Sequence, residues 1–197
     1  MTPKPPAPRP PSLGLWETLS RRLLADATPW LKLWAETLRL PDGRIIEPFY
    51  SIDQPDFAVV FPVSSDRKVL TIWHYRHGPR RITLGLPSGS VAPGEAPEIA
   101  AARELLEETG HVGRQLVSLG AFSLDGNRGC GRGHVYVAND VEMRAQPTHD
   151  DLEEIVLEWM TPAALHQALL SGQVGTMDAA AGIAMGLLHL GEKVGSP

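Results

Sequence analysis

The sequence predicts a domain of the α/β or α+β class, in which many strands precede two helices at the C-terminal end. Three observations lead to this prediction. Apolar runs rich in β-branched residues recur between residues 31 and 160, with turn residues between them. One helical pattern, at residues 96–109, interrupts these runs. Two further helix starts follow residue 160.

The predicted strands begin with a hairpin. Pro41-Asp42-Gly43 is a turn signal between the apolar runs at residues 31–40 and 44–52, so these two runs are expected to pair. A polar turn separates the next two runs, and a glycine-rich segment follows the third. These further strands are predicted at residues 56–63, 68–76, 81–87, 112–124, 134–139 and 153–160.

The first predicted helix covers residues 96–109, with Gly110 in the position after its C-terminus. At about 100° per residue, one apolar stripe forms along it, and three glutamates fall on roughly the opposite side. The stripe is Ile99, Ala102, Leu105, Leu106 and Thr109, and the glutamates are Glu104, Glu107 and Glu108.

Two helices are predicted near the C-terminus. Thr161 is a favourable N-cap, and Pro162 fits the first helical position. Thr176 is the candidate cap of a final helix at residues 177–190. Residues 1–12 contain six prolines and are predicted to form a disordered tail, with an SH3-type ligand as the less favoured alternative.

The composition limits the classes of function. A chain of 197 residues with 43% hydrophobic content favours one domain with a sizeable core. The net charge of −5 speaks against nucleic acid as a partner. We expect no membrane span, because no run approaches the ~18 apolar residues required. The single cysteine, Cys130, and the proline-rich start without a secretory signal favour a cytoplasmic protein.

Four acidic residues gather around one arginine in the segment 89–111. Glu104 and Glu108 are one helical turn apart, Glu107 flanks them, and Glu95 lies just before the helix. Such carboxylates repel one another unless a positive charge lies among them, and Arg103 can satisfy only one. Mg²⁺ prefers oxygen ligands and binds substrate phosphates, so it is the natural occupant. The alternative is a solvated glutamate-rich helix face.

The same segment resembles the Nudix box, G-x5-E-x7-R-E-U-x-E-E-x-G-U, where U is a bulky aliphatic residue. Every fixed letter matches at the right spacing, and the last aliphatic position holds His111. The order of elements over residues 16–190 is similar to the ADP-ribose pyrophosphatase branch of the Nudix hydrolases. In that branch a Q-Y-R-like triplet and an L-P-x-G turn precede the box, here His74-Tyr75-Arg76 and residues 86–89.

The resemblance implies an α/β protein with the Nudix fold, an α/β/α sandwich around a mixed sheet. Residues 13–52 would then form an N-terminal β-hairpin region that contacts a second subunit in a homodimer. The Nudix hydrolase domain would occupy residues 53–191, and residues 192–197 would form a second tail.

The resemblance also implies a metal site and a base. Mg²⁺ or Mn²⁺ would be bound by Glu104, Glu108 and the backbone carbonyl of Ser88, and Glu107 would be a further ligand or orient water. A carboxylate beyond the box acts as base or extra metal ligand in this branch. Glu153 is the first candidate here. Asp151 is the second, because alternation places the two on the same side of an extended segment. The alternative for both is an acidic loop.

Two arginines are candidates for substrate binding. By resemblance, Arg76 would contact the substrate diphosphate or its distal ribose; otherwise it is an ordinary surface arginine. Arg128 lies in the glycine-rich loop 126–133, whose backbone N–H groups and guanidinium could cradle phosphates. The alternative for that loop is a flexible hairpin connection.

The function implied is hydrolysis of the diphosphate bond of a small nucleotide, with ADP-ribose, cut to AMP and ribose 5-phosphate, as the first candidate. Gly85 stands where many members of the branch have glutamate, and Asp125-Gly126 roughly where ADP-ribose-specific members have proline. Other nucleotide sugars therefore stay open. The competing hypotheses are a non-catalytic Nudix module that senses nucleotides and a structural domain without a ligand.

Overall fold

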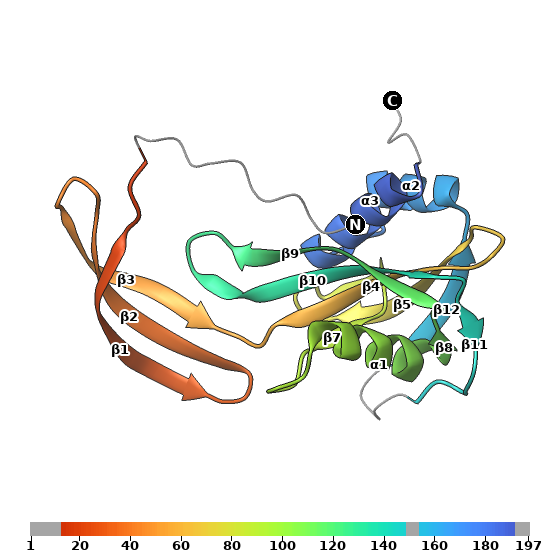
Figure 1. Cartoon of the computed structure of the whole chain (residues 1–197), viewed down its shortest axis with the longest axis horizontal. Helices are drawn as coiled ribbons and strands as arrows, with labels where there is room; N and C mark the ends of the chain where they lie inside the picture. The colour runs from red at the N-terminus through yellow and green to blue at the C-terminus, as the bar shows by residue number, and fades with distance from the viewer. Residues whose placement is uncertain (1–12, 149–153, 192–197) are drawn as a thin grey trace. The chain divides into compact units, whose positions relative to one another are not determined.

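The computed structural model describes residues 13–148 and 154–191 (Figure 1). These residues fall into two compact units. The first comprises residues 13–55 and 122–132, and the second comprises the remaining described residues from 56 onwards. Strands β9 (Gln115–Asp125) and β10 (Gly129–Asn139) each contribute residues to both units.

The first unit is built on three antiparallel strands, β1 (Glu17–Ala27), β2 (Leu31–Arg39) and β3 (Ile45–Asp53). The hairpin predicted around Pro41-Asp42-Gly43 is confirmed, because Leu40 and Arg44 close the turn with a 2.8 Å backbone hydrogen bond. Strand β1 was not predicted from its pattern. All of its residues are exposed, so no alternation between a buried and a solvent face marks it.

Polar contacts hold one part of this small sheet together. The guanidinium of Arg21 lies 4.1 Å from the centre of the Trp34 ring and donates a 2.7 Å hydrogen bond to Asp53. The indole Nε1–H of Trp34 donates to the same carboxylate at 2.8 Å.

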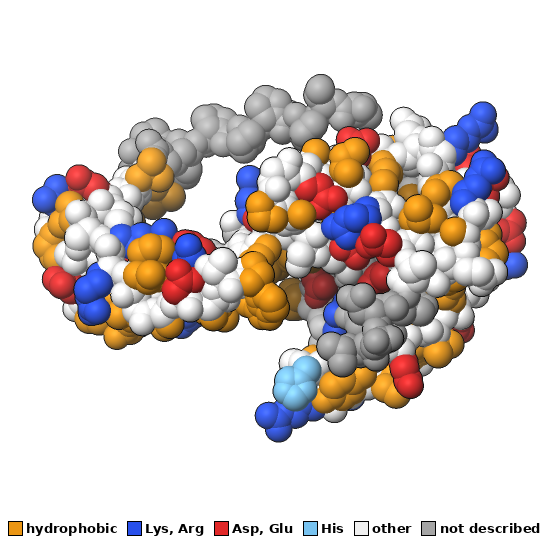
Figure 2. All heavy atoms as spheres, turned by 90° about the horizontal axis from the view of Figure 1, so that it is seen from below, with side chains coloured by type: hydrophobic (Ala, Val, Ile, Leu, Met, Phe, Trp, Pro, Cys, Tyr) orange, Lys and Arg blue, Asp and Glu red, His pale blue; other side chains and the backbone are white. Residues whose placement is uncertain are grey.

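On the face drawn in Figure 2, apolar and charged side chains are interspersed over the molecule.

The second unit contains a mixed sheet. Strand β4 (Phe57–Val63) runs parallel to β10 along seven residue pairs and antiparallel to the short β7 (Ser88–Ser90). Strand β5 (Val69–Arg76) lies between β6 (Arg81–Gly85) and β12 (Ile155–Met160), antiparallel to both. Outside this sheet, β8 (His111–Val112) pairs with β11 (Glu142–Met143).

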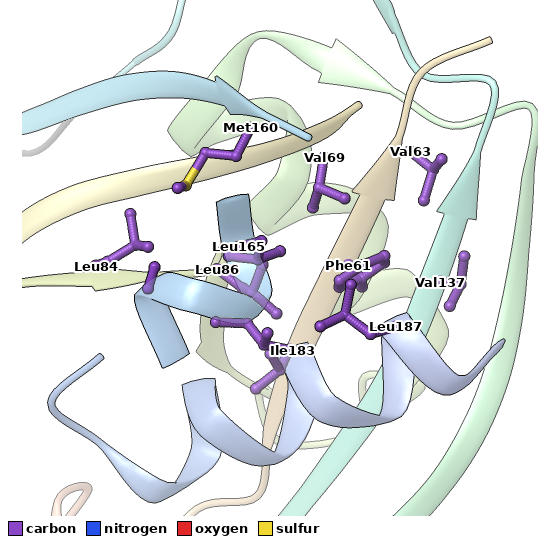
Figure 3. Packing of buried hydrophobic residues seen from close by; sticks show 12 residues of the cluster. Phe61, Val63, Val69, Leu84, Leu86, Val137, Met160, Leu165, Ile183 and Leu187 are labelled. Atoms are coloured by element: carbon purple, nitrogen blue, oxygen red, sulfur yellow. The ribbon is translucent and has the colours of Figure 1, made fainter. Parts of the chain in front are cut away.

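Helices cover both faces of this sheet. Helix α1 (Pro97–Thr109) packs on one face of the sheet, and Val60 of β4 belongs to the hydrophobic core between them. Helices α2 (Pro162–Leu170) and α3 (Met177–His189) cover the other face, where Phe61 packs with Ile183 and Leu187 (Figure 3). Because neighbouring residues of β4 point to opposite faces, one strand contributes to both cores. The result is the three-layer α/β/α arrangement.

The helix ends agree with the sequence pattern in most respects. Gly110 ends α1 in the left-handed conformation, with φ of 71°. The Thr161 side chain accepts a hydrogen bond from the N–H of Ala164 at the start of α2. Thr176 stands at the N-cap of α3, but its side chain makes no capping hydrogen bond. No helix within residues 13–148 and 154–191 is long and apolar enough to cross a membrane.

Candidate active site

The acidic segment folds as a short strand followed by a helix, so that β7 packs against α1. Gly89 is the point of closest approach between them. A Cβ atom at this position would lie 2.0 Å from the carboxyl carbon of Glu104, which no side chain allows. The glycine is therefore required because the backbone of β7 and the Glu104 carboxylate occupy adjoining space.

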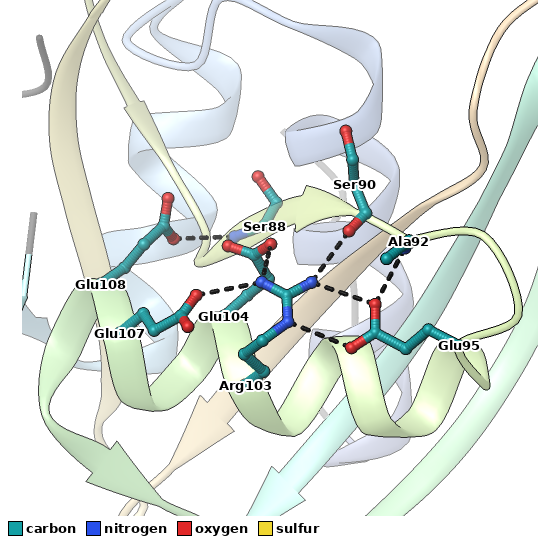
Figure 4. A network of polar contacts seen from close by, with 8 residues as sticks. All are labelled: Ser88, Ser90, Ala92, Glu95, Arg103, Glu104, Glu107 and Glu108. Carbon is teal, nitrogen blue, oxygen red and sulfur yellow. Dashed lines mark hydrogen bonds and ion pairs between the residues drawn. The ribbon is translucent and has the colours of Figure 1, made fainter. Parts of the chain in front are cut away.

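Arg103 is the centre of a hydrogen-bond network (Figure 4). Its Nε and Nη2 donate to the two oxygens of Glu95 at 3.1 and 3.2 Å. Its Nη1 donates to Glu104 at 2.7 Å and to Glu107 at 3.0 Å, and Nη2 also donates to the carbonyl of Ser90 at 3.0 Å. These five contacts match the five N–H donors of a guanidinium.

The charges in this network stabilise one another. Hydrogen bonds that Arg103 donates to Glu95, and in addition to Glu104 and Glu107, raise the pKa of Arg103. The Arg103 guanidinium lowers the pKa of Glu95, and the backbone N–H of Ala92, which donates to Glu95 at 2.9 Å, acts in the same direction. Glu95 therefore braces the loop, because its carboxylate ties the loop after β7 to the helix.

Glu108 is placed differently from the other three glutamates. It is only 7% exposed, although it falls on roughly the side of the helix opposite the predicted apolar stripe. The backbone N–H of Ser88 donates to its Oε2 at 2.9 Å. A buried carboxylate is tolerated where hydrogen-bond donors meet it, and the polar backbone of β7 provides one here. Ile99, assigned to the apolar stripe, is 60% exposed, so that part of the prediction was wrong.

Arg76 lies next to the same loop. It is the last residue of β5, and its Nη2 is 3.4 Å from the Oγ of Ser88. Its Nε donates to the Nε2 of His74 at 2.9 Å. Ser88 is thus in contact with Arg76 through its side chain and with Glu108 through its backbone N–H. Of the predicted substrate and metal residues, Arg76, Ser88, Glu104 and Glu108 are brought together in one place.

The donor set suits a hard divalent cation. Within the described residues, no three His, Cys, Asp or Glu side chains by themselves form a metal-ligand cluster. Glu104 and Glu108 offer two carboxylates on successive turns of α1, beside a backbone loop without a side chain at Gly89. Mg²⁺ is commonly held by one or two carboxylates, with water and substrate oxygens completing its shell. Two glutamates and a backbone carbonyl are consistent with that pattern.

Three other predicted residues belong to different parts of the chain. Arg128 belongs to the first unit, at the turn between β9 and β10, where it pairs with Asp125 at 3.2 Å. Asp151 and Glu153 lie outside the described residues. Their roles stay predictions.

His111, the departure from the box pattern, fills a buried position with polar and aromatic contacts. Its Nδ1 is 2.7 Å from the carbonyl oxygen of Thr109, and its ring meets Trp159 edge to face with centroids 5.5 Å apart. It lies in β8, directly after the Gly110 cap, and is 8% exposed. An imidazole with its donor satisfied thus replaces the aliphatic residue of the pattern.

Sequence reasoning did not identify every member of the site. The Ser90 carbonyl and the Ala92 N–H are backbone groups, and their participation depends on loop conformation, which residue types do not reveal. The contact between His74 and Arg76 had a usable signal. Residues two apart on a strand point to the same side, so this pair could have been recognised by alternation.

The comparisons with known proteins agree with this geometry. A family model described as NUDIX domain matches residues 53–178. The chain is 27% identical over 126 residues to ADP-ribose pyrophosphatase of Bacillus subtilis (strain 168), covering 64% of this chain and 68% of that protein.

Two further similarities bear on the breadth of the family. Identity is 26% over 176 residues to CMP-5'-(N-acetyl-N-hydroxy-3-aminopropyl)phosphonate hydrolase of Streptomyces rubellomurinus (strain ATCC 31215), covering 89% of this chain and 84% of that protein. A solved structure of an ADP compounds hydrolase matches with a TM-score of 0.78 at 20% identity, covering 92% of this chain and 99% of that one. This structural likeness confirms the fold. With the family match over most of the chain, it follows that the protein belongs to the Nudix hydrolases and resembles their ADP-ribose pyrophosphatases.

Proposed function

We propose that this Nudix hydrolase cleaves the diphosphate bond of a nucleoside diphosphate linked to a second moiety, with ADP-ribose as the first candidate. The observation that carries the proposal is the buried Glu108 carboxylate, hydrogen bonded to the loop of Ser88 and one turn from Glu104. Arg76 lies against the same loop and supplies a positive charge. Carboxylates for a cation beside an arginine for phosphate are the groups that such a substrate requires.

Each residue has a distinct part in the proposed reaction. Glu104, Glu108 and the Ser88 carbonyl would hold Mg²⁺ or Mn²⁺. That ion supplies charge neutralisation for the diphosphate and favours ionisation of water. Arg103 fixes the glutamates in position, and Glu107, which is half exposed, orients water or adds a ligand.

The attacking water needs a proton acceptor, for which we propose Glu153, with Asp151 as the second candidate. For ADP-ribose, the water oxygen bonds to one phosphorus as the bridging P–O bond breaks. The products are AMP and ribose 5-phosphate. Positioning and charge stabilisation would provide most of the rate enhancement.

Similarity to a Bacillus subtilis ADP-ribose pyrophosphatase supports ADP-ribose as the substrate. A comparable identity to a hydrolase of a CMP-linked phosphonate keeps other nucleotide conjugates in the test. We would incubate the protein with ADP-ribose, other nucleotide sugars, dinucleoside polyphosphates and oxidised nucleotides, each with Mg²⁺ or Mn²⁺. Phosphate released by a coupled phosphatase reports cleavage.

Two variants make the panel specific. Glu108→Gln should reduce turnover of any active substrate by at least about 100-fold, because it removes one carboxylate charge from the site. Glu142→Gln, the same change at an exposed glutamate of β11, serves as the matched control and should retain activity. Lack of turnover across the whole panel, or full activity of Glu108→Gln, would contradict the proposal.

We also propose a homodimer that involves residues 13–52. Its support is the group of large apolar side chains that this region exposes, namely Leu15, Trp16, Leu23, Leu24 and Trp30. Light scattering after size exclusion should give twice the chain mass of 21.4 kDa. Leu24→Lys should shift the mass toward the monomer, whereas Met177→Lys, at an exposed apolar residue of α3, should not. A monomeric wild type would refute the proposal.

A further inference from the structure

The guanidinium of Arg76 is held by a neighbour on its own strand. His74 and Arg76 are two residues apart on β5, so their side chains lie on the same side of the sheet. The Nε of Arg76 is 2.9 Å from the Nε2 of His74, and the Nη2 of Arg76 is 3.4 Å from the Oγ of Ser88. One end of the guanidinium is therefore fixed by the histidine, while the other is directed at the loop.

The hydrogen bond defines the state of His74. An arginine N–H can only donate, so the Nε2 of His74 must be the unprotonated, accepting nitrogen. The imidazole must then be neutral, with its proton on Nδ1. Its surroundings favour that form: the ring is 6% exposed, and burial lowers the pKa of His74 to about 4. The charge of Arg76 acts in the same direction, and Asp178 of α3 opposes it.

Gly85 leaves the space that the imidazole occupies. Strand β6 runs beside β5, with Gly85 opposite Ile72, the residue two before His74. A Cβ atom at position 85 would lie 3.2 Å from the Nε2 of His74, the nitrogen that accepts from Arg76. Even the smallest side chain there would press on the accepting atom.

We propose that His74 is a positioning residue, which orients Arg76 toward the substrate diphosphate by accepting its Nε–H, and that Gly85 leaves the imidazole room to make this contact. The inference rests on the proposed function, because it assigns Arg76 to the substrate. It adds that the orientation of Arg76 depends on a neutral imidazole and a glycine.

The first test compares two substitutions of His74. His74→Gln keeps an accepting oxygen at a similar distance from the backbone and should stay within about threefold of wild-type KM. His74→Met has comparable size but no good acceptor, and should raise KM about tenfold with little change in kcat, as expected when ground-state binding is lost. Gly85→Ala should raise KM by less than His74→Met, because its Cβ would push the accepting nitrogen by only a few tenths of an ångström.

A double variant separates positioning from a general structural effect. If His74 acts through Arg76, then His74→Met should add little to the KM of Arg76→Gln, so that the two effects are not additive. A purely structural role for His74 would give additive losses and a loss of kcat as well. Additivity, or a wild-type KM in His74→Met, would overturn the proposal.

A spectroscopic measurement decides the contact without using activity. In long-range ¹⁵N spectra at pH 7, the His74 signals, identified by their absence in His74→Gln, should show an unprotonated Nε2 and a protonated Nδ1. An Nε2–H tautomer or an imidazolium would overturn the proposal. Because this result does not depend on turnover, a failed substrate panel together with the expected tautomer would refute the proposed function and leave the contact established.

Discussion

Replacement of Gly89 by alanine should damage the site by displacing the Glu104 carboxylate. The added Cβ would lie 2.0 Å from the carboxyl carbon of Glu104, whereas ordinary contacts begin at 3.4 Å. The carboxylate must therefore move by about 1.4 Å, or β7 must shift. Either response breaks the 2.7 Å hydrogen bond from Arg103 to Glu104. A displacement of roughly 1 Å at a catalytic constellation costs on the order of 100-fold in rate.

The assay is kcat/KM on the best substrate of the panel, with thermal unfolding in the presence and absence of Mg²⁺. Gly89→Ala should lose about 100-fold in kcat/KM, with a stability cost of about 1–3 kcal/mol for the overpacked contact. The increase in melting temperature on adding Mg²⁺ should shrink, because binding to the folded state weakens. Gly78→Ala, with open space around the added atom, is the matched control. A kcat/KM within threefold of wild type for Gly89→Ala would refute the reasoning.

Four further predictions concern single residues elsewhere in the chain. Arg103→Lys keeps the charge but cannot provide five donors in a fork. It should therefore lower the melting temperature and reduce kcat at least tenfold, and unchanged values would show that charge alone suffices. Glu153→Gln should lower turnover at least ~100-fold, the scale of a lost general base, and near wild-type turnover would remove it from the mechanism. Arg128→Ala should raise KM if the glycine-rich loop contacts substrate, and an unchanged KM would favour the flexible-loop alternative. Stability in urea should fall as the pH drops from about 6.5 to about 4, because unfolded His74 takes up a proton with its ordinary pKa of 6.5 while the folded state holds its pKa at about 4; His74→Gln should flatten this dependence, and an equal slope would contradict it.

The elements that the sequence predicts well are those whose signals are local. Helix α1 follows from its apolar periodicity and from Gly110, which ends it with a φ of 71°. The turn at Pro41-Asp42-Gly43 depends only on three neighbouring residue types. The spacing of the acidic segment places Glu104 and Glu108 side by side, because residues four apart lie next to each other on the surface of an α-helix.

Strand β1 shows why other elements are missed. Its sequence, ETLSRRLLADA, has arginines and leucines in adjacent pairs, and all eleven residues are exposed. A strand is recognised from sequence when one of its faces is buried, because burial imposes alternation. Strand β1 pairs with β2 but buries neither of its faces, so that constraint is absent. The pattern therefore contains no periodic signal.

The wrong assignment of Ile99 to the apolar stripe, and the unexpected burial of Glu108, have a related cause. Analysis by periodicity assumes that a helix packs on an apolar surface, so polar residues are assigned to solvent. Helix α1 packs in part against the backbone of β7, which offers N–H groups. Glu108 can turn inward toward the N–H of Ser88, and Ile99 is left outside. Sequence shows which residues are polar, but only the tertiary structure shows which polar partners they meet.

The hydrogen bonds of Arg103 are shared unevenly among the glutamates of the acidic cluster. All five N–H donors of the guanidinium are engaged: two with Glu95, one each with Glu104 and Glu107, and one with the Ser90 carbonyl. Because all five donors are used, Arg103 could form another hydrogen bond to a carboxylate only by giving up one of these. Each carboxylate has about four lone-pair sites, so the acceptor capacity of the four glutamates exceeds what one guanidinium can satisfy. Two of the five bonds go to the glutamate that braces the loop, while Glu108 is met from the backbone side at Ser88. Under the proposed function, a divalent cation held by Glu104 and Glu108 would add positive charge beside Arg103, so that the arginine shapes the site that the cation would occupy.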